Sequence, residues 1–359
     1  MAANSLFSAC NQTKNMAMEI PTEQWWMPDE MSPHTCTWMA FRVNPAIWDQ
    51  DLVASVQNNL AAIARTIAAY EPVNMLVQAE DYELAATKCG KDVNLVVTTF
   101  DDFWVRDTGP VFVTDPQGKL GAIDFNFNGW GNKQSHENDA EVAQFITQQA
   151  SAQLINTHLV LEGGGIEVDG AGTAIITESC VLNRNRNPGL TKADCEAQLK
   201  WLLGIDKVVW LLGLRGHDIT DGHTDFYARF AAPGVVVAHH EPDVTFADHE
   251  ITKQHLEILR AATDSQGKKL EVVSIPAPST VRSEFDHDEF AAGYINFYGA
   301  NGLVLAPEFG DRRADANAKA ILTDLFPERE IIQLNIDAIA AGGGGIHCVT
   351  QQQPEIMAG

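Results

Sequence analysis

The sequence has little positive charge, and this shortage excludes whole classes of partner. Its 24 lysines and arginines face 48 aspartates and glutamates, so the formal net charge is −24. A field of that sign repels nucleic acid and anionic membranes, and it attracts small cations. We therefore expect no nucleic-acid partner and no membrane partner. Excess carboxylate also keeps a protein in solution, so the charge alone identifies no substrate.

Cysteine motifs and long apolar runs are missing as well. None of the six cysteines forms a C-x-x-C pair, which excludes a zinc ribbon or a thioredoxin-like motif, and six in 359 residues do not make a disulfide scaffold. No apolar stretch approaches the ~20 residues of a membrane helix. The first 21 residues lack the basic start and apolar run of a secretory signal. We expect a cytoplasmic protein in a reducing compartment.

Helix and strand patterns alternate along most of the chain. Residues 1–24 are expected to form a flexible N-terminal arm, and residues 25–359, which contain no linker, a single catalytic domain. Apolar residues three and four apart predict an amphipathic helix at 49–70, and the segment 159–177 predicts a hairpin. Short apolar runs predict further strands, and capped amphipathic segments predict further helices, at 73–78, 94–100, 207–212, 234–240, 270–276 and 303–309, and at 191–204, 246–262 and 313–325.

Two polar segments follow predicted strands, where α/β folds usually present their chemistry. In DDFWVRDTGP (101–110), Trp104 precedes Asp107 by three residues. A carboxylate and an aromatic face suit a planar guanidinium cation, although a plain polar loop explains the segment equally well. In LEGGGIEVDG (161–170), Glu162 ends a strand and three glycines follow, which predicts a tight turn. No phosphate-binding Gly-x-x-x-x-Gly-Lys motif is present.

A third segment, GHDITDGHTDFYARF (216–230), contains a histidine next to acids. His223 and Asp225 are two residues apart, so on a strand they would share a face. A carboxylate beside an imidazole raises its pKa and orients the ring, as a general acid/base requires. A metal-dependent hydrolase is the competing hypothesis, although no H-E-x-x-H spacing occurs. Its ligands would come from His217, Asp218, Asp221, His223, Asp225, His239, His240 and Asp243.

The fourth segment, GGGGIHCVTQQQP (342–354), places Cys348 after four glycines. The thiolate is the nucleophilic form of cysteine, and a neighbouring cationic substrate would help to stabilise it. An ordinary buried thiol is the alternative explanation. The glycine run and the polar residues that follow favour a loop shaped for a function.

Together, these segments resemble the agmatine deiminase / bacterial-type (Porphyromonas-type) peptidylarginine deiminase family of the guanidine-modifying (pentein) superfamily. The resemblance extends over nearly the whole chain, with the motifs in the order of the family. The matching segments are MPDEMSPHTCTWMAF (27–41), WVRDTGPVF (104–112), FNFNGWGNK (125–133), LEGGGIEVDG (161–170), LNRNRNPGLTK (182–192), TDGHTDFYARF (220–230), INFYGANG (295–302), PEFGD (307–311) and GGGGIHCVTQQQP (342–354).

The resemblance implies an α/β fold, a five-bladed propeller of ββαβ modules with pseudo-fivefold symmetry and a central site. It also implies a reaction without a metal or organic cofactor, through a covalent amidino-cysteine. The leading example is agmatine, which would yield N-carbamoylputrescine and ammonia. The implied roles are nucleophile for Cys348, general acid/base for His223, guanidinium clamp for Asp107 and Asp225, support of the histidine for Glu162, and pocket walls for Trp104 and Trp130.

Three departures from the family pattern concern the substrate rather than the chemistry. Many agmatine deiminases have an acid four residues before the catalytic histidine, where Ile219 stands here, with Asp218 one position earlier. Gly345 replaces a common asparagine, and Phe41-Arg42 replaces a usual Trp-Pro. Free or peptidyl arginine, or a smaller alkylguanidine, therefore stays open as an alternative substrate. A homo-oligomer also stays open.

Overall fold

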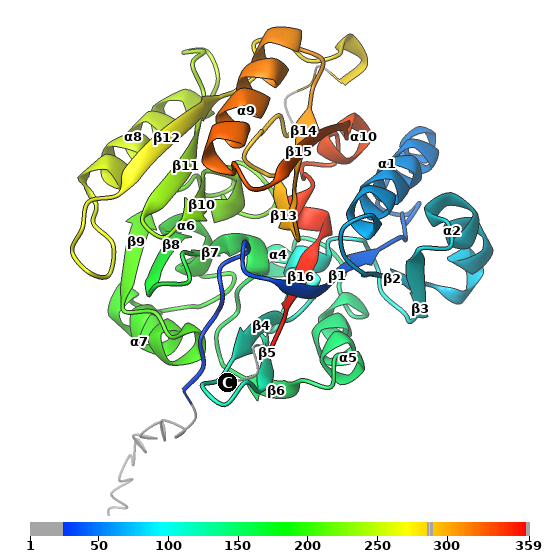
Figure 1. The fold of residues 1–359 in the computed structure, drawn as a ribbon, viewed down its shortest axis with the longest axis horizontal. Helices are drawn as coiled ribbons and strands as arrows, with labels where there is room; N and C mark the ends of the chain where they lie inside the picture. The colour runs from blue at the N-terminus through cyan, green and yellow to red at the C-terminus, as the bar shows by residue number, and fades with distance from the viewer. Residues whose placement is uncertain (1–23, 286, 288–289, 357–359) are drawn as a thin grey trace, which may run out of the picture.

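A computed structural model describes residues 24–285, 287 and 290–356 (Figure 1). The predicted N-terminal arm lies, except for residue 24, outside the described residues. The Trp25 side chain is buried, and Trp26 forms a bridge with Thr114. No helix in the described part of the chain has the length and apolar character that crossing a bilayer requires.

The described strands form five small sheets, arranged around a common centre (Figure 1). Four sheets have three strands, and the first has four. In spatial order they are β16 (Gln351–Pro354), β1 (His34–Ala40), β2 (Val73–Val77) and β3 (Val93–Val97); β4 (Val111–Thr114), β5 (Leu120–Asp124) and β6 (Gln153–Asn156); β7 (Ile166–Val168), β8 (Thr173–Thr177) and β9 (Lys207–Leu211); β10 (Ala228–Ala232), β11 (Val235–His240) and β12 (Glu271–Pro276); β13 (Tyr298–Ala300), β14 (Leu303–Glu308) and β15 (Glu330–Asn335).

Each sheet repeats one plan, which confirms the predicted propeller of ββαβ modules. An antiparallel pair comes first, and a helix then carries the chain to a third strand that is parallel to the second. Parallel neighbours need such a crossover, which is why helix and strand patterns alternate in the sequence. The helices with eight or more residues are α1 (Gln50–Ala68), α2 (Tyr82–Cys89), α5 (Val142–Gln149), α7 (Lys192–Leu203), α8 (Asp248–Ala261) and α9 (Arg312–Leu325).

Most of the predicted helices and strands are present. In the predicted hairpin at 159–177, however, the first strand is β7 and not the LVLEGG segment, so Glu162 does not end a strand. In α1 the side chains of Val56, Leu60, Ile63 and Ile67, spaced by three and four, are buried. Helix α7 begins with a capping box between Thr191 and Asp194. It ends at Gly204, whose φ of 66° is left-handed and favours glycine.

The C-terminal strand closes the ring. β16 pairs with β1 in antiparallel register, with Trp38 opposite Gln351, so the last strand completes the first sheet (Figure 1). Cys348 lies three residues before this strand. The pairing of the two chain ends therefore fixes the position of the predicted nucleophile.

Short helical turns precede the first strand in four of the five sheets. They are α3 (Val105–Thr108), η3 (Gly163–Gly165), η4 (Thr224–Phe226) and η6 (His347–Val349). α3 lies against both η3 and η6, and η3 lies against η4, so the turns meet at the centre of the ring. The remaining short turns are α4 (Gly129–Asn132), α6 (Glu178–Val181), α10 (Asp337–Ala340), η1 (Ala79–Asp81), η2 (Asp139–Glu141) and η5 (Ser283–Phe285).

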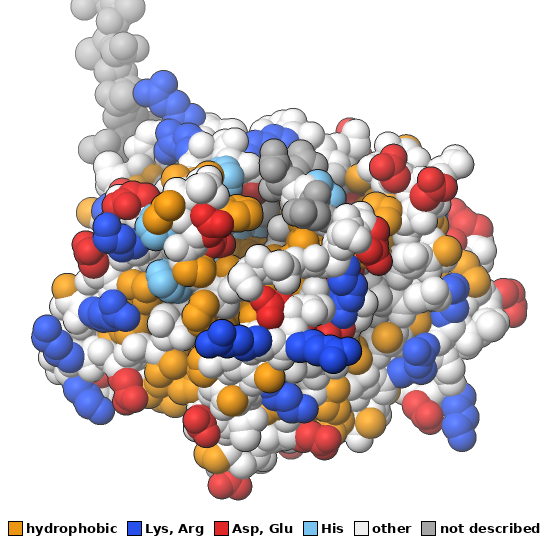
Figure 2. All heavy atoms as spheres, turned by 90° about the horizontal axis from the view of Figure 1, so that it is seen from above, with side chains coloured by type: hydrophobic (Ala, Val, Ile, Leu, Met, Phe, Trp, Pro, Cys, Tyr) orange, Lys and Arg blue, Asp and Glu red, His pale blue; other side chains and the backbone are white. Residues whose placement is uncertain are grey.

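The surface in Figure 2 mixes charges of both signs with hydrophobic side chains. Lysines and arginines are dispersed on this face among acidic residues and do not gather into one basic patch.

Candidate active site

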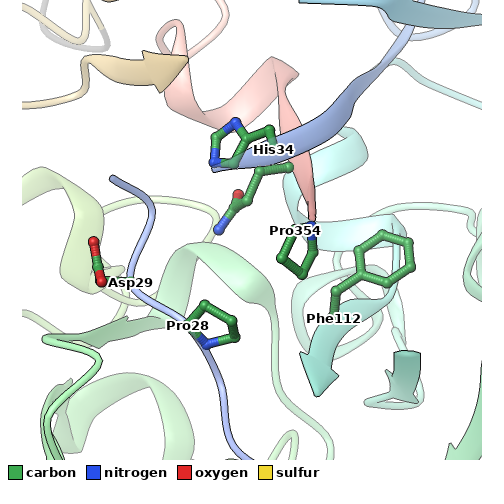
Figure 3. Close-up of a pocket in the computed structure, with 6 residues that line it drawn as sticks. Pro28, Asp29, His34, Phe112 and Pro354 are labelled. Carbon is green, nitrogen blue, oxygen red and sulfur yellow. The ribbon is translucent and has the colours of Figure 1, made fainter. Parts of the chain in front are cut away.

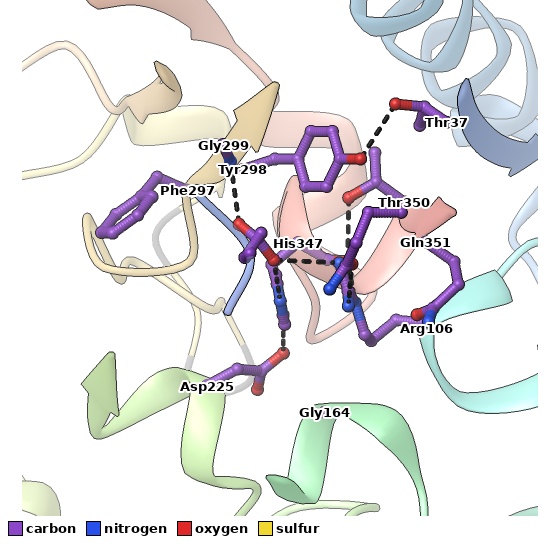
Figure 4. Close-up of polar contacts among 12 residues, drawn as sticks. Thr37, Arg106, Gly164, Asp225, Phe297, Tyr298, Gly299, His347, Thr350 and Gln351 are labelled. Atoms are coloured by element: carbon purple, nitrogen blue, oxygen red, sulfur yellow. Dashed lines mark hydrogen bonds and ion pairs between the residues drawn. The ribbon is translucent and has the colours of Figure 1, made fainter. Parts of the chain in front are cut away.

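Four of the predicted site residues converge on the central turns. Three of them approach Gly164, and Figure 4 shows Gly164 and one of the three, Asp225. A Cβ at Gly164 would lie 2.6 Å from His223 Nδ1, 3.0 Å from Asp107 Oδ1 and 3.1 Å from Asp225 Oδ2. The Cys348 thiol completes the group, with its Sγ 3.7 Å from Asp225 Oδ2. Only glycine at position 164 allows three functional side chains to approach one point of the backbone.

All four side chains are buried, with exposed fractions of 7% for Cys348, 2% for His223, 7% for Asp107 and 0% for Asp225. The expectation that His223 and Asp225 share the face of a strand is wrong. His223 caps the 3-10 turn η4, Asp225 lies inside it, and β10 begins only at Ala228. Gly222, with φ of 88°, turns the chain into this segment. The directions of the His223 and Asp225 side chains are therefore set by a turn and not by the pleat of a strand.

Glu162 stands behind the histidine. One of its oxygens lies 3.4 Å from His223 Nε2, and the Arg186 Nε donates to the same carboxylate at 2.8 Å. Burial alone would raise the pKa of Glu162, but His223 and Arg186 hold it below its usual range. Arg186 was not among the predicted site residues. The only sequence signal for Arg186 is its position in the LNRNRNPGLTK motif. Its partner, Glu162, is 24 residues away, so no local pattern connects the two residues.

His223 lies between two acids. Its Nδ1 is 3.7 Å from Asp107 Oδ2, on the side opposite Glu162. Burial would lower the pKa of the ring, but Asp107, Cys180 and Glu162 outweigh it and raise this pKa well above its usual value. This shift favours the charged form of the imidazole, which can donate a proton.

The Cys348 thiol is held in its neutral form. Burial, Asp225 and Asp107 together raise its pKa well above the usual value, while the Gly345 backbone and Asn296 oppose that effect. Asn296 Nδ2 lies 3.4 Å from Sγ, and its Oδ1 accepts from the His347 backbone at 3.0 Å. The sequence reasoning did not identify Asn296, which stands in the INFYGANG motif 52 residues before the thiol.

The two aspartates differ in how they are held. Asp107 accepts from Trp130 Nε1 at 2.9 Å and from the Gly164 backbone at 3.1 Å. Burial and the neighbouring acids raise its pKa. Burial would raise the pKa of Asp225 too, but His347 lowers it. The Oδ1 atom of Asp225 is buried and accepts no hydrogen bond from the described residues. A buried unsatisfied acceptor is costly, and a cationic N–H donor would satisfy it.

The remaining predicted residues lie around this centre. Trp104 stands against Gly344, where a Cβ would lie 2.2 Å from the indole ring, and it packs against Phe103. Trp130 reaches the centre through its bond to Asp107 and has a left-handed φ of 53°. An aromatic residue in that conformation is strained, and such strain is typical of functional sites.

Ile219 and Asp218 belong to a more exposed loop. Ile219 is 37% exposed, and its carbonyl accepts from Lys133 Nζ at 2.8 Å. Asp218 Oδ1 accepts from the backbone and hydroxyl of Thr220, at 2.6 and 2.5 Å, and from the Gly222 backbone. This oxygen is therefore committed to the turn that carries His223.

The ligands of the hypothetical metal site are dispersed. Asp221 pairs with Lys133 and Arg186, and His217 approaches Asp248 at 3.5 Å. Among the described residues, one compact group of candidate ligands exists, formed by Glu162, Cys180 and His223, and it does not contain Asp225. The metal ligands proposed from the sequence therefore do not come together in one site around Asp225.

A small void lies elsewhere, near the seam where β16 joins β1 (Figure 3). Its volume is about 10 Å³, and its lining residues are Pro28, Asp29, His34, Phe112, Gln352 and Pro354. That volume holds one water molecule at most, so the void is no substrate site.

The fold and the site together define a class. The five-bladed α/β propeller is the fold of guanidine-modifying enzymes, and its centre here holds a cysteine, a histidine and two aspartates. The sequence pattern of the Porphyromonas-type peptidyl-arginine deiminases matches residues 26–354. The chain therefore belongs to this family, as its motifs predicted.

Relatives with known names cover nearly the whole chain. Agmatine deiminase of Stutzerimonas stutzeri is 38% identical over an alignment 354 positions long that covers 92% of this chain and 95% of the relative. Agmatine deiminase of Pseudomonas aeruginosa is 36% identical over an alignment 351 positions long that covers 91% of this chain and 95% of the relative. The solved structure of agmatine deiminase from Enterococcus faecalis has a TM-score of 0.87 at 31% identity, covering 93% of this chain and 97% of that one.

Proposed function

We propose that the protein hydrolyses agmatine to N-carbamoylputrescine and ammonia, through a covalent amidino intermediate on Cys348. One observation carries this proposal: three turns from separate sheets bring a thiol, an imidazole and two carboxylates around Gly164. Relatives named as agmatine deiminases, similar over more than nine tenths of the chain, support the choice of substrate.

The two aspartates would bind the guanidinium group. Carboxylates accept paired hydrogen bonds from planar guanidinium, and Asp225 Oδ1 awaits such a donor. With both acids engaged, the guanidinium carbon is held next to Sγ, which supplies proximity. The cation also offsets the two negative charges that keep the Cys348 thiol neutral. Substrate binding therefore favours release of the thiol proton to solvent, and the thiolate forms when the guanidinium carbon is in place.

The first half of the reaction ends with ammonia. The thiolate adds to the guanidinium carbon, and a C–S bond forms. Charged His223 gives its proton to the leaving nitrogen, the C–N bond breaks and ammonia departs. Glu162 and Asp107, on opposite sides of the ring, stabilise the charged imidazole before this step.

The second half regenerates the enzyme. Neutral His223 takes a proton from water, and the resulting hydroxide adds to the same carbon. The C–S bond then breaks, the hydroxyl proton of the adduct passes to the sulfur, and the ureido product leaves with the Cys348 thiol restored. The C–N bond of the substrate is thus replaced by a C–S bond and then by a C–O bond, while protons move through Cys348, His223 and water. No oxidation state changes, so the reaction requires no oxidant or reductant.

The burial of the site favours a slender free guanidine over a peptide. The four central side chains are at most 7% exposed, so a substrate must reach them end-on. Trp104 and Trp130 are proposed as pocket walls. Free arginine and smaller alkylguanidines remain the alternative substrates, because Ile219 provides no charge for a distal amine.

We also propose a cytoplasmic location and a single catalytic domain. The five cysteines in the described residues are all free thiols, which supports a reducing, cytoplasmic compartment. Because β16 pairs with β1, we propose that residues 25–359 act as one catalytic domain.

The direct test is a panel of guanidines scored for ammonia and ureido product. We expect agmatine to give the highest kcat/KM, and Cys348→Ala to release no ammonia. Cys195→Ala is the matched control, because this buried thiol lies in the distant helix α7. A Cys348→Ala enzyme that retains turnover would refute the proposal. If kcat/KM is higher for arginine than for agmatine, arginine and not agmatine is the substrate.

A further inference from the structure

The residue directly before the nucleophile connects two buried carboxylates. His347 Nδ1 lies 2.7 Å from Asp225 Oδ2, and its Nε2 lies 2.9 Å from Glu30 Oε2 (Figure 4). The exposed fractions are 2% for His347, 0% for Asp225 and 8% for Glu30. Glu30 belongs to the MPDE segment, which the proposed chemistry does not use.

Between two ionised carboxylates, the ring carries a proton on each nitrogen. An ionised carboxylate can only accept hydrogen bonds, so each ring nitrogen that faces one must donate. His347 with both nitrogens donating is a cation, and its two bonds are charge-assisted on both sides. A buried cation with two such partners has a fixed orientation.

The surrounding charges agree with that protonation. Arg106 Nη2 lies 3.2 Å from Glu30 Oε2, and Arg229 bridges Glu30 at 2.9 Å and Glu167 at 2.8 Å. The buried cluster then contains three carboxylates and two guanidinium groups: Glu30, Glu167, Asp225, Arg106 and Arg229. A protonated His347 gives three charges of each sign. Burial of charge is tolerated when it is paired in this way.

The consequence falls on Asp225. Its Oδ2 is held by His347, which prevents rotation of the carboxylate and keeps it ionised, while its Oδ1 stays without a described partner. Glu30 in turn is held by Arg106, Arg229 and the Gly299 backbone, which donates at 2.8 Å. The ring is therefore anchored from the far side.

We propose that Glu30, His347 and Asp225 form a positioning relay, in which His347 orients Asp225 so that its free oxygen receives the guanidinium group. The proposal rests on the proposed function, since it concerns the same substrate. His347 is a positioning residue and does not touch the reacting atoms. Through Glu30, the segment that precedes the first strand becomes part of the site.

Two substitutions at His347 separate the two ends of the relay. An asparagine places its amide near the position of Nδ1, so His347→Asn keeps a donor for Asp225. A glutamine places its amide near Nε2, so His347→Gln keeps a donor for Glu30 and leaves Asp225 unheld. Both remove the charge, and Glu30 keeps its other partners in either variant.

The measurement is the Kd of agmatine by calorimetry, in a Cys348→Ala background that prevents turnover. We expect His347→Gln to raise Kd about 10- to 100-fold, as for loss of a hydrogen bond between charged groups. His347→Asn should raise it several-fold less. Equal Kd values in the two variants, or values within about twofold of the parent, would overturn the relay.

A second buried histidine supplies the matched control. His255 lies in helix α8, is 1% exposed, accepts from the Gly213 backbone through Nε2 at 3.1 Å and packs against Tyr227, so its partners belong neither to the relay nor to the four central residues. His255→Gln should lower the melting temperature without changing Kd. If it weakens binding as much as His347→Gln does, general loss of folding explains the effect and the relay is wrong.

Glu30→Gln keeps the experiment decisive should His347→Gln not fold. Loss of the second carboxylate loosens the ring, and we expect Kd to rise about 2- to 10-fold. An unchanged Kd would overturn the relay. Failure of the proposed function would look different, because the wild-type enzyme would then release no ammonia from agmatine and the Cys348→Ala enzyme would not bind it.

Discussion

Asp225→Asn should lower turnover and raise the reactivity of the thiol at the same time. The substitution keeps the shape of the side chain and removes a charge whose oxygen lies 3.7 Å from Cys348 Sγ. At an effective dielectric constant of about 20, a unit charge at this distance contributes about 4 kcal/mol, an upper figure. Since 1.36 kcal/mol is one pKa unit, the thiolate fraction at neutral pH should rise by up to about 10³-fold.

Turnover moves the other way. The asparagine amide cannot accept the guanidinium bonds that the carboxylate accepts, and hydrogen bonds to charged groups contribute about 1.5–3 kcal/mol. We expect kcat/KM for agmatine to fall at least ~10²-fold, because orientation of the guanidinium carbon is lost as well.

Two assays test the expected rise in thiol reactivity and the expected fall in turnover. Alkylation of Cys348 by iodoacetamide, followed by peptide mass against pH, reports the thiolate, and ammonia release reports turnover. Cys348→Ala serves as the blank. The reasoning is refuted if alkylation in Asp225→Asn slows down, or if turnover is undiminished.

Four further predictions concern two acids, the rim of the site and metal removal. Glu162 helps to raise the pKa of His223, so Glu162→Gln should move the alkaline limb of kcat/KM to lower pH; an unmoved limb would contradict the role of the pair. Burial raises the pKa of Asp102 from 3.8 to about 7, so the folded state holds a proton that the unfolded state loses between about pH 4 and 7. The free energy of unfolding should therefore fall as pH rises through that window, by up to about 4 kcal/mol. The melting temperature of Asp102→Asn should depend less on pH there than that of the parent. Ile219→Glu should improve kcat/KM for agmatine about 2- to 5-fold, as for an exposed ion pair, and no change would place the amine elsewhere. EDTA should leave ammonia release unchanged, whereas lost activity restored by Zn²⁺ would revive the metal hypothesis.

Local patterns in the sequence predicted most of the secondary structure. The spacing in α1 and the capping box at Thr191 depend on neighbours within one turn, and both are present as predicted. The fivefold repeat was not detectable as a sequence repeat, because its modules share a path of the chain and not a residue pattern. It entered through the family resemblance, which the structure confirms.

The site was predicted less completely, for a physical reason. Residues with a chemical signature, such as Cys348 after its glycines, could be selected from the sequence. Asn296, His347 and Glu30 act through partners 52 to 317 residues away, and no local pattern reports such contacts. The strand assigned to His223 and Asp225 was wrong, because alternation in a short polar segment does not distinguish a strand from a 3-10 turn.

The most direct measurement is the identity of the residue that carries the covalent intermediate. Rapid acid quenching of the enzyme with agmatine, followed by proteolysis and peptide mass spectrometry, would locate it. The account predicts one adduct, with the mass of agmatine less ammonia, on Cys348. An adduct on Cys180 or Cys195, or turnover at full rate with no adduct formed at any time, would contradict it.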